Sequence, residues 1–210
     1  MIKTWIADVT PLYETETYRR YYCLVPDFRK EKADKITVWE KKAQSIGVWV
    51  LLQKMRQYYS LDEQANFNLS HSGKYVLCSV DDSGTKGAEV GCDVEMVGRY
   101  HAKIANRYFA EEEIDWINGK QALERSERFY RIWVLRESFL KATRKGMQLD
   151  MKTFAFHMKN MEQKWELSRQ PKDFWKKYYF QEYRVGNGEA RAAVCADRCE
   201  FSKTMKRFCF

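Results

Sequence analysis

Residues 90–95 read Val-Gly-Cys-Asp-Val-Glu, and this stretch decides how the fold is understood. Apolar residues alternate with Asp93 and Glu95, so the pattern predicts a strand that turns both carboxylates to one face. Two acids on one strand face repel each other, and a basic chain has no general need for that arrangement. Such a pair is a natural beginning of a site for a hard cation.

Further along the chain, residues 133–141 read Trp-Val-Leu-Arg-Glu-Ser-Phe-Leu-Lys and predict a helix. Glu137 and Lys141 stand four residues apart, so both side chains project from one helix face. The pair is equally explained as a surface ion pair, worth about 0.2–0.5 kcal/mol. Placed next to Asp93 and Glu95, it would complete a set of three carboxylates and one ammonium suited to metal-assisted phosphoryl transfer.

The composition indicates a folded chain with anionic partners. Its 210 residues, 45% of them apolar, suffice for one large domain or two small ones. The net charge of +8 favours nucleic acid, an acidic membrane, a phosphorylated cofactor or an acidic protein. No stretch resembles a membrane span or a secretory signal, so we expect a cytoplasmic protein with reduced cysteines. The six cysteines form no C-x-x-C pair, so no structural zinc site is expected.

The first half of the chain reads as a strand, one long helix and three further strands. The helix is expected to begin at Pro26 and to continue to Tyr59. The loop at residues 81–87 is rich in Gly and Asp, which predicts a hairpin between the last two strands. The strands of this half are expected at residues 3–9, 66–70, 75–80 and 89–95.

The second half begins after a break in the pattern at residues 97–99. Helices are expected at residues 101–108, 110–117 and 123–145, and strands at 154–157, 164–168, 175–183 and 190–195. Each half thus contains helices followed by antiparallel strands, which predicts the α+β class. The repeated order suggests two similar halves, residues 1–98 and 99–210, although no sequence repeat joins them.

Residues 68–73, Asn-Leu-Ser-His-Ser-Gly, combine hydroxyls, an imidazole and a glycine turn. Small residues leave backbone N–H groups accessible, so the segment is able to hold a phosphate. Taken alone, a structural turn histidine is the more frequent explanation. Glu113, at the start of an expected helix, is explained by the helix dipole. A serine hydrolase is disfavoured because the chain has no G-x-S-x-G motif.

Four of these segments, in order and spacing, resemble the 4′-phosphopantetheinyl transferase family, and among its members the surfactin-synthetase-activating type. The segments are residues 68–73, 91–95, 108–113 and 133–141. The resemblance implies two α+β halves in a pseudo-twofold arrangement, with coenzyme A and a metal ion in the cleft between them. It also implies a holo-[acyl-carrier-protein] synthase that acts on coenzyme A and an acidic apo acyl or peptidyl carrier protein.

The same resemblance assigns roles to residues of this chain. Asp93, Glu95 and Glu137 would hold Mg²⁺, with Mn²⁺ as an alternative ion. Glu137 would take the proton of the attacking carrier serine, and Lys141 would stabilise or protonate the leaving 3′,5′-ADP. The remaining coenzyme contacts implied by the resemblance are Asn68, Ser70, His71, Lys141 and, for the 3′-phosphate, Lys32 and Lys35.

The chain departs from the family pattern in three places. Arg136 stands where the family usually has Lys, and Arg144-Lys145-Gly146 where Gly-Lys-Gly is frequent. Only residues 61–67 connect the long helix to the Asn68 segment, where relatives carry a longer loop with a Gly-Lys-Pro element. This short connection motivates an alternative, a non-catalytic module that binds coenzyme A or a carrier protein.

Other properties follow from the residues less directly. Nucleic-acid binding is disfavoured, because acids at the proposed site would repel phosphates when no metal is bound. We expect a monomer, since both halves lie in one chain. We also expect no membrane partner. The carrier protein stays open among those of fatty-acid, polyketide, nonribosomal-peptide and aminoadipate-reductase systems.

Overall fold

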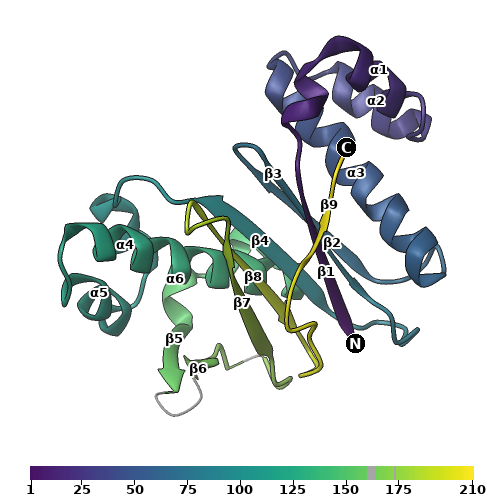
Figure 1. Cartoon of the computed structure of the whole chain (residues 1–210). Helices are drawn as coiled ribbons and strands as arrows, with labels where there is room; N and C mark the ends of the chain where they lie inside the picture. The colour runs from purple at the N-terminus through teal and green to yellow at the C-terminus, as the bar shows by residue number, and fades with distance from the viewer. Residues whose placement is uncertain (160–163, 173) are drawn as a thin grey trace.

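Two β-sheets occupy the middle of the molecule, and helices cover their outer faces (Figure 1). The structure, a computed structural model, describes residues 1–159, 164–172 and 174–210. The expected α+β class is confirmed, because helices and mainly antiparallel strands form separate layers. Within the described residues, no helix is long and apolar enough to cross a membrane.

The first sheet has the strand order β2-β3-β1-β9 and is covered by α3. Alternate residues of β1 and β3, among them Trp5 and Val76, pack against Leu51 and Met55 of α3. The intervening residues, among them Ile6 and Leu77, pack against the second sheet, so the alternation places side chains on two buried faces. The elements are β1 (Ile2–Asp8), α3 (Trp39–Tyr59), β2 (Phe67–Ser72), β3 (Tyr75–Asp81) and β9 (Lys206–Phe208).

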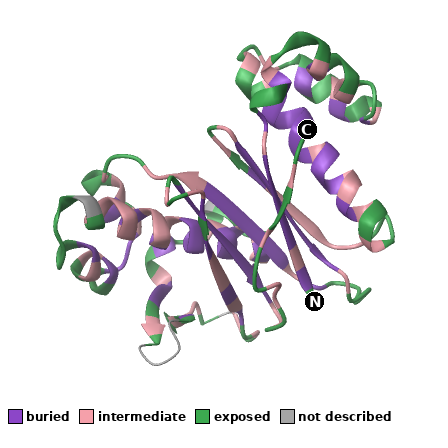
Figure 2. Ribbon diagram, in the orientation of Figure 1, coloured by how far each residue is buried: buried purple, intermediate pink, exposed green. Residues whose placement is uncertain are grey.

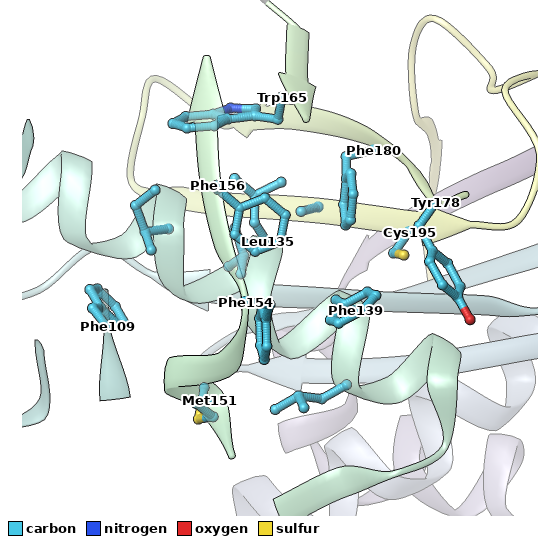
Figure 3. Close-up of a cluster of buried hydrophobic side chains, with 14 of the residues drawn as sticks. Phe109, Leu135, Phe139, Met151, Phe154, Phe156, Trp165, Tyr178, Phe180 and Cys195 are labelled. Carbon is cyan, nitrogen blue, oxygen red and sulfur yellow. The ribbon is translucent and has the colours of Figure 1, made fainter. Parts of the chain in front are cut away.

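The second sheet has the order β4-β8-β7, and α6 packs across β4 and β8. An aromatic cluster fills the space around α6, with Phe139 surrounded by Phe154, Tyr178 and Phe180 (Figure 3). The elements are β4 (Val90–Met96), α4 (Ala102–Tyr108), α5 (Glu111–Asn118), α6 (Ala122–Thr143), β5 (Ala155–Lys159), β6 (Lys164–Arg169), β7 (Tyr179–Val185) and β8 (Ala190–Ala196), with two 3₁₀ turns, η2 (Gly146–Gln148) and η3 (Met151–Thr153), between α6 and β5.

Apart from β9, each of the two sheets takes one strand before its long helix and two strands after it, and β5 and β6 pair antiparallel in a separate two-stranded sheet between α6 and β7. β1 pairs antiparallel with β3, and β4 pairs antiparallel with β8. Each sheet contains strands from both sides of the expected boundary at residue 98. β4 precedes the boundary but pairs with β8, and β9 follows it but pairs in parallel with β1. The division at residue 98 and the pseudo-twofold arrangement stay predictions.

The expected single helix from Pro26 to Tyr59 is wrong, since two helices occupy this region. α2 (Asp27–Asp34) ends before Val38, whose backbone is extended at φ −81° and ψ 121°. The β-branched run Ile36-Thr37-Val38 disfavours helix, and the sequence reading missed it because the apolar spacing continues across the break. Two preceding elements, η1 (Thr10–Tyr13) and α1 (Thr15–Tyr22), were also not predicted.

The expected hairpin between β3 and β4 is also wrong, because these strands belong to different sheets. Turn composition reports local conformation only, whereas β4 takes its partner from β8, far along the chain. The two sheets face each other across an apolar cluster that includes Ile6, Leu77, Val94 and Val194. Buried residues accordingly line the sheets and the sheet-facing sides of α3 and α6 (Figure 2).

Candidate active site

Gly91 lets α6 approach β4 more closely than any other residue would. A Cβ atom here would lie 2.1 Å from the carbonyl oxygen of Ser138 and 2.3 Å from the backbone nitrogen of Ala142. Asp93 and Glu95 follow Gly91 at intervals of two, so they share its face of the strand. This close approach brings β4, which carries Asp93 and Glu95, next to α6, which carries Glu137 and Lys141.

Lys141 connects these two elements. Its Nζ lies 2.7 Å from Asp93 Oδ1, 3.0 Å from Ser70 Oγ and 3.1 Å from the carbonyl oxygen of Cys92. Burial is the largest influence and would lower the pKa of Lys141, but Asp93, Cys92 and Glu137 together outweigh it and raise this pKa. Lys141 is therefore a cation held against β4, and the alternative of a surface ion pair with Glu137 does not describe it.

The three carboxyl groups influence one another. Burial raises the pKa of Asp93, although Lys141 opposes the shift. Burial and the charges of Asp93 and Glu137 raise the pKa of Glu95, and burial and Asp93 raise that of Glu137. The three carboxyl groups therefore form a cluster of negative charge, and Lys141 contacts one of them, Asp93.

The donor chemistry of this cluster fits a divalent cation such as Mg²⁺. All three groups are carboxylates, which hard cations prefer. Asp93 Oδ2 is buried and has no hydrogen-bond partner, which leaves an oxygen for a ligand. In the described part of the chain, however, no three His, Cys, Asp or Glu side chains already form a metal-binding group. The ligand set Asp93, Glu95 and Glu137 therefore stays a prediction.

Three alternate side chains of β2 bind the free edge of β4. The backbone N–H groups of Cys92, Val94 and Met96 donate to Asn68 Oδ1 at 3.0 Å, to Ser70 Oγ at 3.4 Å and to Ser72 Oγ at 3.3 Å, respectively. We call these six residues the β2–β4 seam. Side-chain oxygens stand here where carbonyl oxygens stand in a regular sheet, so the seam joins the two sheets without a backbone ladder.

The seam hydroxyls also reach the carboxylates of β4. Ser70 Oγ donates to Asp93 Oδ1 at 2.8 Å, and Ser72 Oγ donates to Glu95 Oε2 at 2.6 Å. Ser70 and Asn68 were expected to contact the coenzyme, whereas Ser72 was not expected to have a role of its own. The spacing of Asn68, Ser70 and Ser72 at every second residue was the signal that could have identified the row.

His71 lies on the opposite side of β2 from the seam, near several cations. Partial desolvation, followed by the charges of Lys41, Lys141 and Arg29, lowers the pKa of His71 to about 4, even though the side chain is exposed. A neutral imidazole among cations is a setting in which an anion is expected to bind. Lys41 and Arg29 could not be predicted as site residues, because neither lies in a motif.

The expected 3′-phosphate contacts, Lys32 and Lys35, are exposed on α2 and at its C-terminal end. The charges that act on His71 come from Lys41, Lys141 and Arg29 instead. Arg29 is buried, and its Nε donates to the carbonyl oxygen of Ser45 at 2.8 Å. The roles of Lys32 and Lys35 stay predictions.

Glu113 and Arg136 form a buried ion pair away from this site. Both side chains are fully buried, and Arg136 Nε donates to Glu113 Oε2 at 3.1 Å. Glu113 also accepts from the backbone N–H groups of Ala110 and Phe156, each at 2.9 Å. The interpretation of Glu113 as a helix-start charge was thus incomplete, and Arg136 serves the core beneath α6.

Similarity to known proteins covers most of the segments described above. A family model described as the 4′-phosphopantetheinyl transferase superfamily matches residues 89–195. The 4′-phosphopantetheinyl transferase Sfp of Bacillus subtilis is 31% identical over 65% of this chain and 57% of its own length. The 4′-phosphopantetheinyl transferase gsp of Aneurinibacillus migulanus is 32% identical over 45% of this chain and 38% of its own.

The chain therefore spans less than two thirds of the length of these relatives. Among solved structures, the holo-[acyl-carrier-protein] synthase of Thermotoga maritima aligns with a TM-score of 0.43 and 23% identity, covering 51% of this chain and 61% of its own. A holo-(acyl-carrier-protein) synthase from Bacillus anthracis in complex with CoA aligns at 0.42 and 14% identity, covering 51% and 93% of the two chains.

Proposed function

We propose that this chain, which belongs to the 4′-phosphopantetheinyl transferase superfamily, transfers the phosphopantetheine group of coenzyme A to a serine of an apo carrier protein. The observation that carries the proposal is the contact of Lys141 with Asp93 on a strand that Gly91 allows α6 to approach. This contact joins an ammonium to one carboxylate, and Glu95 and Glu137 lie on the same two elements, which supports a site with the groups that phosphoryl transfer uses.

In the proposed reaction, the carrier serine Oγ attacks the β-phosphorus of coenzyme A. A new O–P bond forms, the bond from that phosphorus to the bridging oxygen breaks, and 3′,5′-ADP leaves. Glu137, directly or through a water, takes the serine proton. Lys141 stays protonated and stabilises the negative charge on the departing 3′,5′-ADP.

Asp93, Glu95 and Glu137 would hold the divalent cation, Mg²⁺ or Mn²⁺. When bound, the cation supplies Lewis-acid charge to the pyrophosphate oxygens. His71, Lys41 and Arg29 would bind phosphate oxygens of the coenzyme on the other side of β2.

The carrier protein is the proposed macromolecular partner. A net charge of +8 supports steering of an acidic carrier toward this chain. We further propose that the protein acts in the cytoplasm as a monomer.

The test is the intact mass of an apo carrier protein after incubation with this protein, coenzyme A and Mg²⁺. We expect the mass to increase by one phosphopantetheine group, and a chelator to prevent the increase. Glu137→Ala should slow the transfer by about 10²–10⁴-fold, the usual contribution of a general base. Glu124→Ala, an exposed change on the same helix, should leave the rate unchanged.

The non-catalytic alternative predicts a different result. If coenzyme A binds but no carrier from the fatty-acid, polyketide or nonribosomal-peptide classes gains mass, the chain is a binding module. If coenzyme A does not bind, the short connection at residues 61–67 is the first place to examine.

A further inference from the structure

The β2–β4 seam does more than join two sheets, because it reaches a carboxylate proposed to bind the cation. We propose that Ser72 is a positioning residue: its hydroxyl orients the Glu95 carboxylate for a divalent cation. The inference rests on the proposed function, since it takes Glu95 to be a metal ligand. The observation behind it is the hydrogen bond of 2.6 Å from Ser72 Oγ to Glu95 Oε2.

The direction of the Ser72 hydroxyl is set by the backbone of β4. A serine hydroxyl has one donor and two acceptor positions. The N–H of Met96 donates to Ser72 Oγ at 3.3 Å, so one acceptor position is used. The donor then points to Glu95, the residue immediately before Met96. The strand that carries Glu95 thus also orients the group that holds its carboxylate.

Glu95 has fewer hydrogen bonds to hold its carboxylate than Asp93 has. Asp93 Oδ1 receives two hydrogen bonds, from Ser70 Oγ and Lys141 Nζ. For Glu95, the described residues provide one side-chain hydrogen bond, that of Ser72. Glutamate also has more rotatable bonds than aspartate, so an unsupported carboxylate would lose more freedom on binding a cation.

Groups that hold a metal ligand in place have a known size of effect. Removing such an outer partner typically weakens metal affinity by about 10–100-fold. The bond from Ser72 occupies part of Oε2 and leaves Oε1 of Glu95 for the cation. Ser70 is less suitable for this role, because it donates to Asp93 and accepts from both Lys141 and Val94.

The experiment measures Mn²⁺ binding to the full chain, with and without coenzyme A, by electron paramagnetic resonance of free Mn²⁺. Ser72→Ala should raise the Mn²⁺ dissociation constant by about tenfold. Ser72→Thr keeps the hydroxyl and should stay within about threefold of the unchanged protein. The matched control is Ser79→Ala, which removes a buried hydroxyl that bonds Thr4 in the same sheet and the Cys92 thiol on β4; among the described residues, no hydrogen bond joins this hydroxyl to a carboxylate.

Carrier modification provides the second readout. In Ser72→Ala the Mg²⁺ concentration for half-maximal transfer should rise by about tenfold, while the KM for coenzyme A stays within about twofold. Ser79→Ala should lower thermal stability and leave both values unchanged. A purely structural role of Ser72 would make the two alanine variants behave alike.

The outcomes separate this inference from the proposed function. If the unchanged protein binds Mn²⁺ and modifies the carrier, and Ser72→Ala matches it in Mn²⁺ affinity, the positioning role is overturned and the function stands. If Ser72→Thr binds as weakly as Ser72→Ala, the hydroxyl is not the cause and the role is overturned. If the unchanged protein binds no Mn²⁺ in either condition, the metal site and the inference both fail.

Discussion

Replacing Glu113 with alanine should strongly destabilise the fold. The carboxylate, 1% exposed, accepts hydrogen bonds from Arg136 and from the backbone N–H groups of Ala110 and Phe156. Alanine would leave the buried guanidinium without a counter-charge and two N–H groups without an acceptor. Neither side chain is exposed, and this burial lowers the pKa of Arg136 and raises that of Glu113.

The magnitude follows from these contacts. Removing one partner of a buried ion pair costs about 3–5 kcal/mol. Arg136 keeps its hydrogen bonds to the carbonyl oxygens of Met151 and Phe154, so we expect a loss near the middle of that range, about 4 kcal/mol. At about 2–4 °C per kcal/mol for a chain of this size, Tm should fall by about 10 °C.

The assay is urea unfolding followed by tryptophan fluorescence. The two N–H groups bond to different oxygens of Glu113, so Glu113→Gln retains an acceptor for one of them and should lose less than Glu113→Ala. Glu112→Ala, an exposed neighbour 3.8 Å from Arg169, is the control and should change stability by less than about 1 kcal/mol. The reasoning is refuted if Glu113→Ala lowers the free energy of unfolding by less than about 1 kcal/mol.

Three further predictions concern the site itself. Gly91→Ala should cost about 3 kcal/mol or more in thermal unfolding, because its Cβ meets backbone atoms of α6; a loss below about 1 kcal/mol would contradict this close approach. His71 should titrate near pH 4 by NMR and shift upward when pyrophosphate binds; a value near 6.5 would contradict the partial desolvation and the nearby cations. Because its folded pKa lies below the unfolded value of 6.5, His71 should make the fold lose stability as pH falls from about 6.5 toward 4. Lys41→Ala should weaken coenzyme A binding about tenfold by calorimetry, and Lys32→Ala should weaken it less. Equal losses of affinity would instead support Lys32 as a phosphate contact.

The sequence predicted the parts of the site that depend on local periodicity. Asp93 and Glu95 alternate along β4, and Lys141 stands one turn from Glu137 on α6, so their faces could be assigned without the structure. The meeting of the two faces was expected only from the family resemblance. Its physical cause, the absence of a side chain at Gly91, depends on packing that one sequence pattern does not report.

Features that depend on distant partners were missed. The hairpin after β3 was wrong because strand pairing is decided between segments far apart in sequence. β9 has three residues, too few for a period of two to be recognised. Arg136 was judged by its place in the motif, whereas its side chain turns to Glu113 on a different helix.

The β2–β4 seam has a consequence for the exchange of backbone amide protons with water. Since the N–H groups of Cys92, Val94 and Met96 turn to β2, those of the intervening residues turn to β8 and its backbone carbonyls. A side-chain hydroxyl can rotate away from an amide by itself, while a backbone carbonyl leaves only when the strand moves. Deuterium should therefore enter β4 alternately, faster at Val94 and Met96 than at Asp93 and Glu95, through openings that leave the rest of the sheet closed.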